Sequence, residues 1–251
     1  MAAIQEPGGF LLTLPTPPAS TISSPGPHLA PTLPVPRNQP LKSGSSKESS
    51  FIAYVDRKLL DISRDYEKRF DGGYEGFGAC AKDLEGVVDV VWVSGTPSLQ
   101  TPYLLTIALA VTNYMPAFNF APRETFSLLG KMDVALSSLL QGRNAETGNA
   151  LPGFEGGRGR MSVTDKVRMR GIVSDTRLAV VNVAGKGMDS VRGESRIETE
   201  TEDEEDFNME SNAEINYEED RSGPGSWEME VARVYERTIV ELGSTLDSSG
   251  Y

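Results

Sequence analysis

The run LLTIALAV at residues 104–111 constrains the fold of this chain more than any other stretch. It extends to PYLLTIALAVTNYM over residues 102–115 without a charged residue or a polar face. Crossing a bilayer takes about 20 predominantly apolar residues, and a longer window here would have to include Gly95, Pro97 and Gln100. We therefore expect the central, fully buried helix of a bundle, with Thr101 as its N-cap and Pro102 at its first position, rather than a membrane segment.

The first helix of the folded region is predicted near Ser49, with Ser49 or Ser50 as its N-cap. Its apolar residues recur three or four positions apart and so share one stripe, which ends before Asp71-Gly72-Gly73. The members of the stripe are Phe51, Val55, Leu59, Ile62, Tyr66 and Phe70.

A second helix is predicted from about Ala79 to Val93. The segment VVDVVWV at residues 87–93 could instead form a buried strand, because β-branched residues and Trp favour sheets. We prefer a helix because the sequence contains no evident partner strand.

Two further helices are predicted. One begins at Pro122 and ends at Gly142, with a packing seam of Leu129, Met132, Leu136 and Leu139. The other opens with a capping box formed by Ser162 and Asp165 and stops near Gly185. The apolar contacts of this last helix are expected from Val163, Val167, Leu178 and Val181.

These segments predict an all-α fold, a single bundle of about five helices at residues 49–184. Residues 1–48 are expected to be a disordered tail, because ten of the 16 prolines lie among the first 40 residues, interspersed with Ser.

Acidic residues concentrate near the C-terminus, and residues 185–225 are expected to be a disordered acidic linker. From Glu194 to Asp220 there are 13 acidic residues and one basic residue, a net charge of −12 that equals the charge of the whole chain. Such a segment repels phosphate backbones.

A short amphipathic helix is predicted at residues 226–243, followed by a disordered end at 244–251. This helix can dock on the bundle or bind a protein partner, and its separation by a long charged linker makes partner binding a real alternative. For a partner, the contacting residues would be Trp227, Val231 and Val234.

Residues with catalytic chemistry are scarce. Cys80 and His28 are the single cysteine and histidine, so catalytic Cys–His or Ser–His–Asp sets and Cys/His metal sites are not expected in the folded part. Gly185-Lys186 lacks the glycine and the hydroxyl residue that a phosphate-binding loop needs. We expect no cofactor, no small-molecule substrate and no enzyme activity. The alternative is a small enzyme that uses the helix carboxylates Asp83, Glu85, Asp89 and Asp133.

A basic cluster lies between residues 158 and 170. It could contact nucleic-acid phosphates, pair with the acidic segment of the same chain, or form a solvated face, and the last two are favoured because no aromatic residues interleave it. Its members are Arg158, Arg160, Lys166, Arg168 and Arg170.

The stretch from VVDVVWVSGTPSLQTPYLLTIALAV through KMDVALSSLLQG, with LPGFEGG and MSVTDKVRMRGIVSDTRLAV, resembles a family of poorly characterised filamentous-ascomycete proteins. Some members carry the label of a meiotic recombination protein. The resemblance covers about residues 51–184 and implies a fungal origin and a helical domain. It assigns no catalytic residue, and the missing phosphate-binding loop argues against a recombinase.

The function expected from these patterns is that of a non-catalytic intracellular adaptor or regulatory subunit, in the nucleus or cytoplasm, which binds an unidentified protein. The alternative is a chromatin or meiotic recombination accessory factor that contacts DNA through residues 158–170.

Overall fold

The computed structural model of the chain describes residues 32–157, 159–194 and 227–247. The expectations for residues 1–31, Arg158, 195–226 and 248–251 lie outside these ranges. Within the described ranges the fold is all-α, as predicted, and no strand occurs apart from an isolated bridge. The elements are α1 (Ser46–Glu67), α2 (Phe77–Val93), α3 (Pro97–Tyr114), η1 (Met115–Ala117), α4 (Pro122–Gln141), η2 (Glu155–Gly157), α5 (Val163–Glu194), α6 (Trp227–Arg233) and α7 (Glu236–Asp247).

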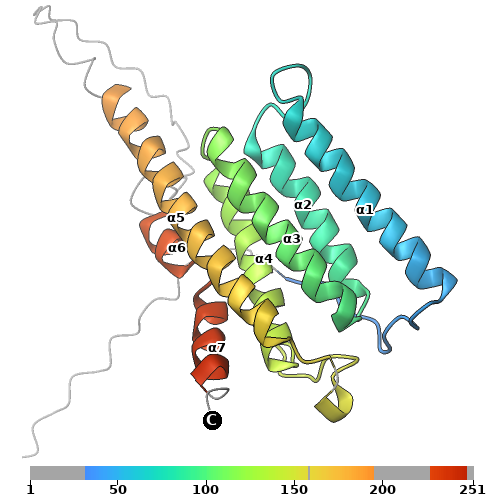
Figure 1. Ribbon diagram of the computed structural model, residues 1–251. Coiled ribbons are helices and arrows are strands. Elements are labelled where there is room, and N and C mark those ends of the chain that lie inside the picture. The colour runs from blue at the N-terminus through green and yellow to red at the C-terminus, as the bar shows by residue number, and fades with distance from the viewer. Residues whose placement is uncertain (1–31, 158, 195–226, 248–251) are drawn as a thin grey trace, which may run out of the picture.

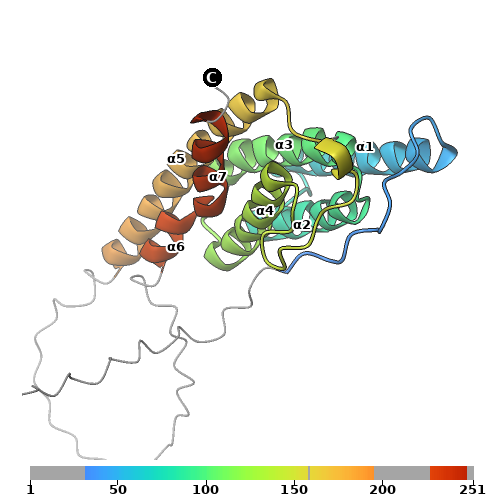
Figure 2. The ribbon, with the colours of Figure 1, turned by 90° about the horizontal axis from the view of Figure 1, so that it is seen from below.

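The helices form one bundle with α1 at one side and α5, α6 and α7 at the opposite side (Figures 1 and 2). Helix α2 packs on α1, α3 and α4, and α4 in turn packs on α7. None of the described helices is both long and apolar enough to cross a membrane.

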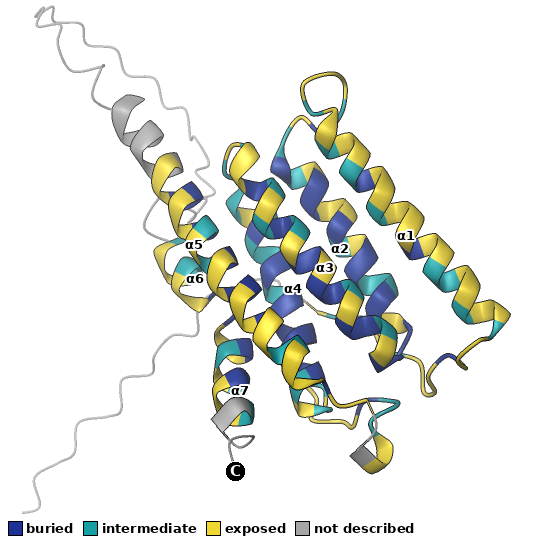
Figure 3. Cartoon of the chain, in the orientation of Figure 1, coloured by how far each residue is buried: buried dark blue, intermediate teal, exposed yellow. Residues whose placement is uncertain are grey.

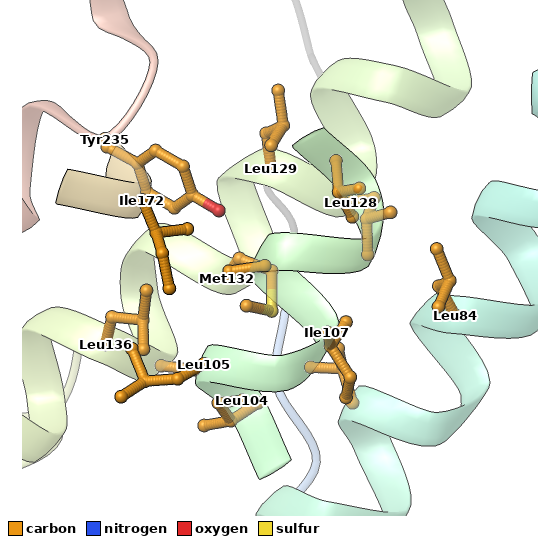
Figure 4. Packing of buried hydrophobic residues seen from close by; sticks show 14 of the residues in the cluster. Leu84, Leu104, Leu105, Ile107, Leu128, Leu129, Met132, Leu136, Ile172 and Tyr235 are labelled. Carbon is orange, nitrogen blue, oxygen red and sulfur yellow. The ribbon is translucent and has the colours of Figure 1, made fainter. Parts of the chain in front are cut away.

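Helix α3 contains the apolar run, and it is central but not fully buried. It begins at Pro97, one turn earlier than expected, so that Pro97 takes the N1 position and Pro102 lies inside the helix. Thr106 is exposed and Leu109 is 39% exposed, which corrects the expectation of burial on all sides. Its buried apolar side chains are Leu104, Leu105, Ile107, Ala108 and Val111, and the helix packs against α2, α4 and α5. Figure 4 shows Leu104, Leu105 and Ile107 in this core.

Helix α1 also begins earlier than the sequence indicated. Its N-cap is Ser45 rather than Ser49 or Ser50, and the Ser45 Oγ accepts a hydrogen bond of 3.2 Å from the Glu48 amide. The Glu48 carboxylate accepts the amide of Gly44 at 2.6 Å. This reciprocal Ser–Glu arrangement satisfies two amides at the start of the helix, which explains why it outcompetes the later serines.

Part of the segment assigned to the N-terminal tail is ordered on the bundle. The Leu41 amide donates to the Thr96 Oγ1 at 2.8 Å, and the Arg37 amide donates to the Val93 carbonyl at 3.1 Å. Leu41 itself is buried. The folded unit therefore begins before residue 49, and the apolar contacts of Leu33 and Leu41 together with two hydrogen bonds from backbone amides hold this stretch in place.

Helix α5 opens with the predicted capping box. The Ser162 Oγ accepts the Asp165 amide at 3.1 Å and donates to the Asp165 carboxylate at 2.6 Å. The helix continues to Glu194, past the expected stop at Gly185. A glycine inside a helix costs only about 1 kcal/mol relative to Ala, and no proline follows to end the helix.

The C-terminal region forms two helices rather than one. Helices α6 and α7 are separated at Val234 and Tyr235, where Tyr235 adopts a left-handed conformation with φ 56°. Both helices lie against α5, and α7 also packs on α4. The Tyr235 side chain is fully buried and lies close to Leu129, Met132 and Ile172 (Figure 4).

Candidate protein-interaction surfaces

The three residues expected to contact a partner lie in the C-terminal region that docks on the chain's own bundle, Trp227 and Val231 on α6 and Val234 between α6 and α7. The Trp227 ring stacks on Phe126 of α4, with 5.5 Å between the centroids and 15° between the planes. Val234 is only 4% exposed, whereas Trp227 and Val231 are half-buried. While α6 and α7 stay docked, a partner could therefore reach Trp227 and Val231 in part and Val234 hardly at all.

Asp133 of α4 caps the N-terminus of α7. Its Oδ1 accepts the Thr238 amide at 2.8 Å and the Thr238 hydroxyl at 2.7 Å, and its Oδ2 accepts the Arg237 amide at 3.2 Å. Burial raises the pKa of Asp133, and the hydrogen bonds from Thr238 and Arg237 oppose that shift without cancelling it. The carboxylate is thus occupied in joining two helices and is not directed at a substrate.

The other carboxylates proposed for catalysis are also used by internal contacts. Lys131 of α4 lies 2.9 Å from both the Glu85 and the Asp89 carboxylates of α2. Burial alone lowers the pKa of Lys131, but its hydrogen bonds to the two carboxylates and their charges outweigh burial and raise it. Asp83 accepts the Tyr74 hydroxyl at 2.7 Å.

The cysteine thiol is sequestered as well. Cys80 is fully buried, and desolvation, with a smaller contribution from the charge of Asp83, raises its pKa to about 12. A thiol of this kind is a poor nucleophile near neutral pH. In the part of the chain that the structure describes, no three His, Cys, Asp or Glu residues are placed to hold a metal ion.

The basic cluster does not form one compact patch. Arg160, Arg168 and Arg170 are exposed and Lys166 is half-buried. Arg160 and Lys166 line a hollow of about 680 Å³ beside the C-terminal end of α4, which Arg143 also lines. Arg168 and Arg170 are two positions apart on α5, so they project roughly 200° apart around its axis.

One expectation is wrong for the outer face of α5. We define this face by Val163, Val167, Leu178 and Val181. The sequence suggested that these residues pack in the core, yet their exposed fractions are 59%, 58%, 62% and 52%. The side of α5 that faces the bundle is a different set: Met169, Ile172, Val173, Val180 and Val183. This second set has the same helical spacing, so the sequence contained two apolar stripes on one helix, and only the structure shows which one is covered (Figure 3).

A groove of about 610 Å³ lies at the other side of the molecule. It is formed between the ordered N-terminal stretch, the start of α1 and the end of α2. Its lining is mainly apolar, with Leu41, Phe51 and Val90 among its walls, and Arg37 and Lys47 also line it.

Comparison with protein families gives one match that covers most of these elements. Residues 73–243 match the TFB6 family, described as subunit 11 of the general transcription factor TFIIH. The chain belongs to the TFB6 family. The matched TFB6 region runs from just before α2 into α7, so it includes the docked C-terminal helices and leaves α1 outside.

A curated relative supports the fungal origin implied by the resemblance. It is a Schizosaccharomyces pombe protein described as uncharacterized, 27% identical over 135 residues that cover 51% of this chain and 74% of the relative. No solved structure matches the chain. The description of the TFB6 family points to transcription, and the comparisons do not support the meiotic alternative.

Proposed function

We propose that this protein is a non-catalytic subunit of TFIIH that acts in the nucleus through protein–protein contacts. The observation that carries the proposal is the TFB6 match over residues 73–243, because it runs from α2 into α7 and is not an isolated motif. Lys131 and Asp133 use their charges to join helices within the bundle, which supports a non-catalytic role.

The partner contacts belong to surfaces that stay exposed in the docked state. The outer face of α5 carries four exposed apolar side chains, and the half-exposed Trp227 and Val231 remain candidates on the adjoining helix. Direct DNA contact by the exposed Arg160, Arg168 and Arg170 is a separate possibility, and it predicts binding that weakens steeply with salt.

The test is purification of the tagged full-length protein from its native cells after nuclease treatment. We expect the other TFIIH subunits to copurify, as measured by quantitative mass spectrometry against an untagged control. Absence of every TFIIH subunit from the wild-type preparation would refute the proposal. Recovery that disappears only after nuclease treatment would indicate an association through DNA instead.

A further inference from the structure

The outer face of α5 carries an apolar row with no covering element among the described residues. Val163, Val167, Leu178 and Val181 fall within about 60° around the helix axis, given the 100° turn per residue of an α-helix. Single exposed apolar residues are common on protein surfaces, but here four of them, each more than half exposed, are aligned on one helix as two pairs about 17 Å apart.

The middle of this row carries small residues. Gly171 and Ser174 lie between the two apolar pairs and are both exposed. A Cβ placed on Gly171 would meet no atom within 4 Å, so open space lies directly above the helix backbone. A helix laid across α5 can approach closely at this point while its own apolar side chains contact the pairs on either side.

Basic residues border the row along one edge. Lys166, Arg170 and Arg177 lie within about 60° of it around the helix axis, and Arg177 also donates to the Ala232 carbonyl of α6 at 3.4 Å. On the other side Arg168 and Lys186 lie farther from the row, at about 80°, and Asp175 lies between them and the row. The other acidic residue between positions 163 and 186 is Asp165, which is engaged with Ser162. At the start of α5, Arg143 and Arg160 line the hollow together with Glu155.

We infer that the outer face of α5 binds an acidic amphipathic helix of another TFIIH subunit. This inference rests on the proposed function and names the chemistry of the contact. Apolar residues of the partner helix would cover the Val163–Val167 and Leu178–Val181 pairs, and carboxylates along one of its edges would meet Lys166 and Arg170.

Two other occupants fit the surface less well, and a third has the same charge as the proposed helix. A second copy of the same face in antiparallel packing would bring the two basic edges together. Nucleic acid would satisfy the basic edge and leave the apolar row without a partner, since phosphates do not cover apolar side chains. The chain's own acidic segment between Glu194 and Asp220 has the right charge, and the experiment distinguishes it from another subunit.

The first experiment compares two double variants of the full-length tagged protein. Val167→Glu with Leu178→Glu places charge on the outer face of α5. Leu60→Glu with Val240→Glu is the matched control, because these residues are similarly exposed, at 49% and 64%, on α1 and α7. Circular dichroism and thermal melting of both variants check that exposed substitutions leave the fold intact.

We expect the α5 variant to recover roughly tenfold less TFIIH than wild type, because charge in the centre of an apolar contact is strongly unfavourable, and the control to recover about as much as wild type. Normal recovery by a folded α5 variant would overturn the inference and leave the proposed function intact. If wild type itself recovers no TFIIH, the proposed function fails instead.

The second experiment identifies the chemistry of the occupant. A zero-length carbodiimide reagent joins lysine amines directly to carboxylates, so Lys166 in the purified complex should crosslink to Asp or Glu residues of another subunit within an apolar-rich helix. Lys166→Arg should abolish that crosslink and preserve recovery. Crosslinks to residues 194–220 of the same chain, to a second copy, or to no acidic residue would each overturn the assignment.

Discussion

At the scale of single residues, Asp133 joins two helices that are far apart in the sequence. Its carboxylate accepts two amides of the first turn of α7, those of Arg237 and Thr238, and 105 positions separate it from Thr238. Helix starts usually find such a cap in their own flanking sequence. Here Tyr235 precedes the helix and offers no carboxylate or small hydroxyl, so the cap comes from α4.

Asp133→Ala should lower the free energy of unfolding by about 1–3 kcal/mol, because buried amides of Arg237 and Thr238 would lose their acceptor. Urea unfolding of the full-length protein followed by circular dichroism measures the loss. Asp175→Ala removes an exposed carboxylate from α5 and serves as the control. Equal stability of the two variants would show that the cap contributes nothing.

Lys131→Met should also destabilise the protein, by about 1–3 kcal/mol, because Glu85 and Asp89 would face each other across one helical turn with no cation between them. These carboxylates are partly exposed, at 26% and 37%, so the loss is expected below that of a fully buried pair. Adding Glu85→Gln and Asp89→Asn to Lys131→Met should restore much of the stability. A triple variant no more stable than Lys131→Met would contradict this account.

Because of the buried Cys80 thiol, we expect the stability of the protein to fall at alkaline pH. Its pKa is raised by burial from 9.0 to about 12, so the folded state retains the proton that the unfolded state loses. The contribution of this group to stability is therefore complete below pH 9 and declines as the pH rises toward 12. Cys80→Ser should lose less stability than wild type over this interval, as measured by urea unfolding at a series of pH values. A parallel loss in the two proteins would argue against a buried thiol.

At the scale of elements, α5 combines a covered stripe with an uncovered one. Gly171 lies on the uncovered side, in a helix interior where glycine is unfavourable, and a Cβ there meets nothing within 4 Å. A helix optimised only for stability would carry Ala at this position.

Gly171→Ala should therefore raise the unfolding free energy by roughly 0.5–1 kcal/mol. If a partner helix approaches closely at this point, the same change should weaken recovery of TFIIH, so stability and binding would move in opposite directions. Gly95→Ala is the contrasting control and should destabilise, because its φ is +56° and its Cβ would lie 2.9 Å from the Arg37 carbonyl. Thermal melting measures both changes.

At the scale of the whole molecule, the C-terminal helices complete the bundle. Removing residues 227–251 should uncover the α4 surface beneath Tyr235 and Leu242, both nearly inaccessible in the intact protein. We expect a lower melting temperature and increased binding of a hydrophobic dye. A chain ending at Asp247 retains α6 and α7 and should behave as wild type. Unchanged melting of the shorter protein would mean that these helices are peripheral.

Periodicity in the sequence predicts which segments are helical. It predicts less well where each helix begins and which other helices it packs against. The stripe from Phe51 to Tyr66, the start at Pro122 and the left-handed Gly142 at the end of α4 follow from local spacing and chain chemistry. Phe70 was also expected in the stripe, but it lies beyond the end of α1 and is 87% exposed. Local spacing does not decide between two equivalent signals for the start of a helix. Pro97 and Pro102 both follow a threonine, and Ser45 competes with Ser49, so only long-range packing and hydrogen bonds decide where those helices begin.

The candidate site was predicted less well than the fold, for a related reason. The spacing of Val163, Val167, Leu178 and Val181 is the same whether a helix shows that face to the core or to solvent. A second stripe through Met169, Ile172 and Val180 was present and competed for the same core. Likewise, nothing near Asp133 in the sequence indicates a cap for a helix a hundred residues later.

The 105 positions between Asp133 and Thr238 also determine the order in which α4 and α7 are made during synthesis of the chain. Asp133 leaves the ribosome well before the amides that it caps, and 105 residues at about 5–20 residues per second take roughly 5–20 s to make. During this time the surface of α4 that α7 will cover is open to other proteins. A nascent or prematurely ended chain therefore displays an apolar surface that the finished protein hides.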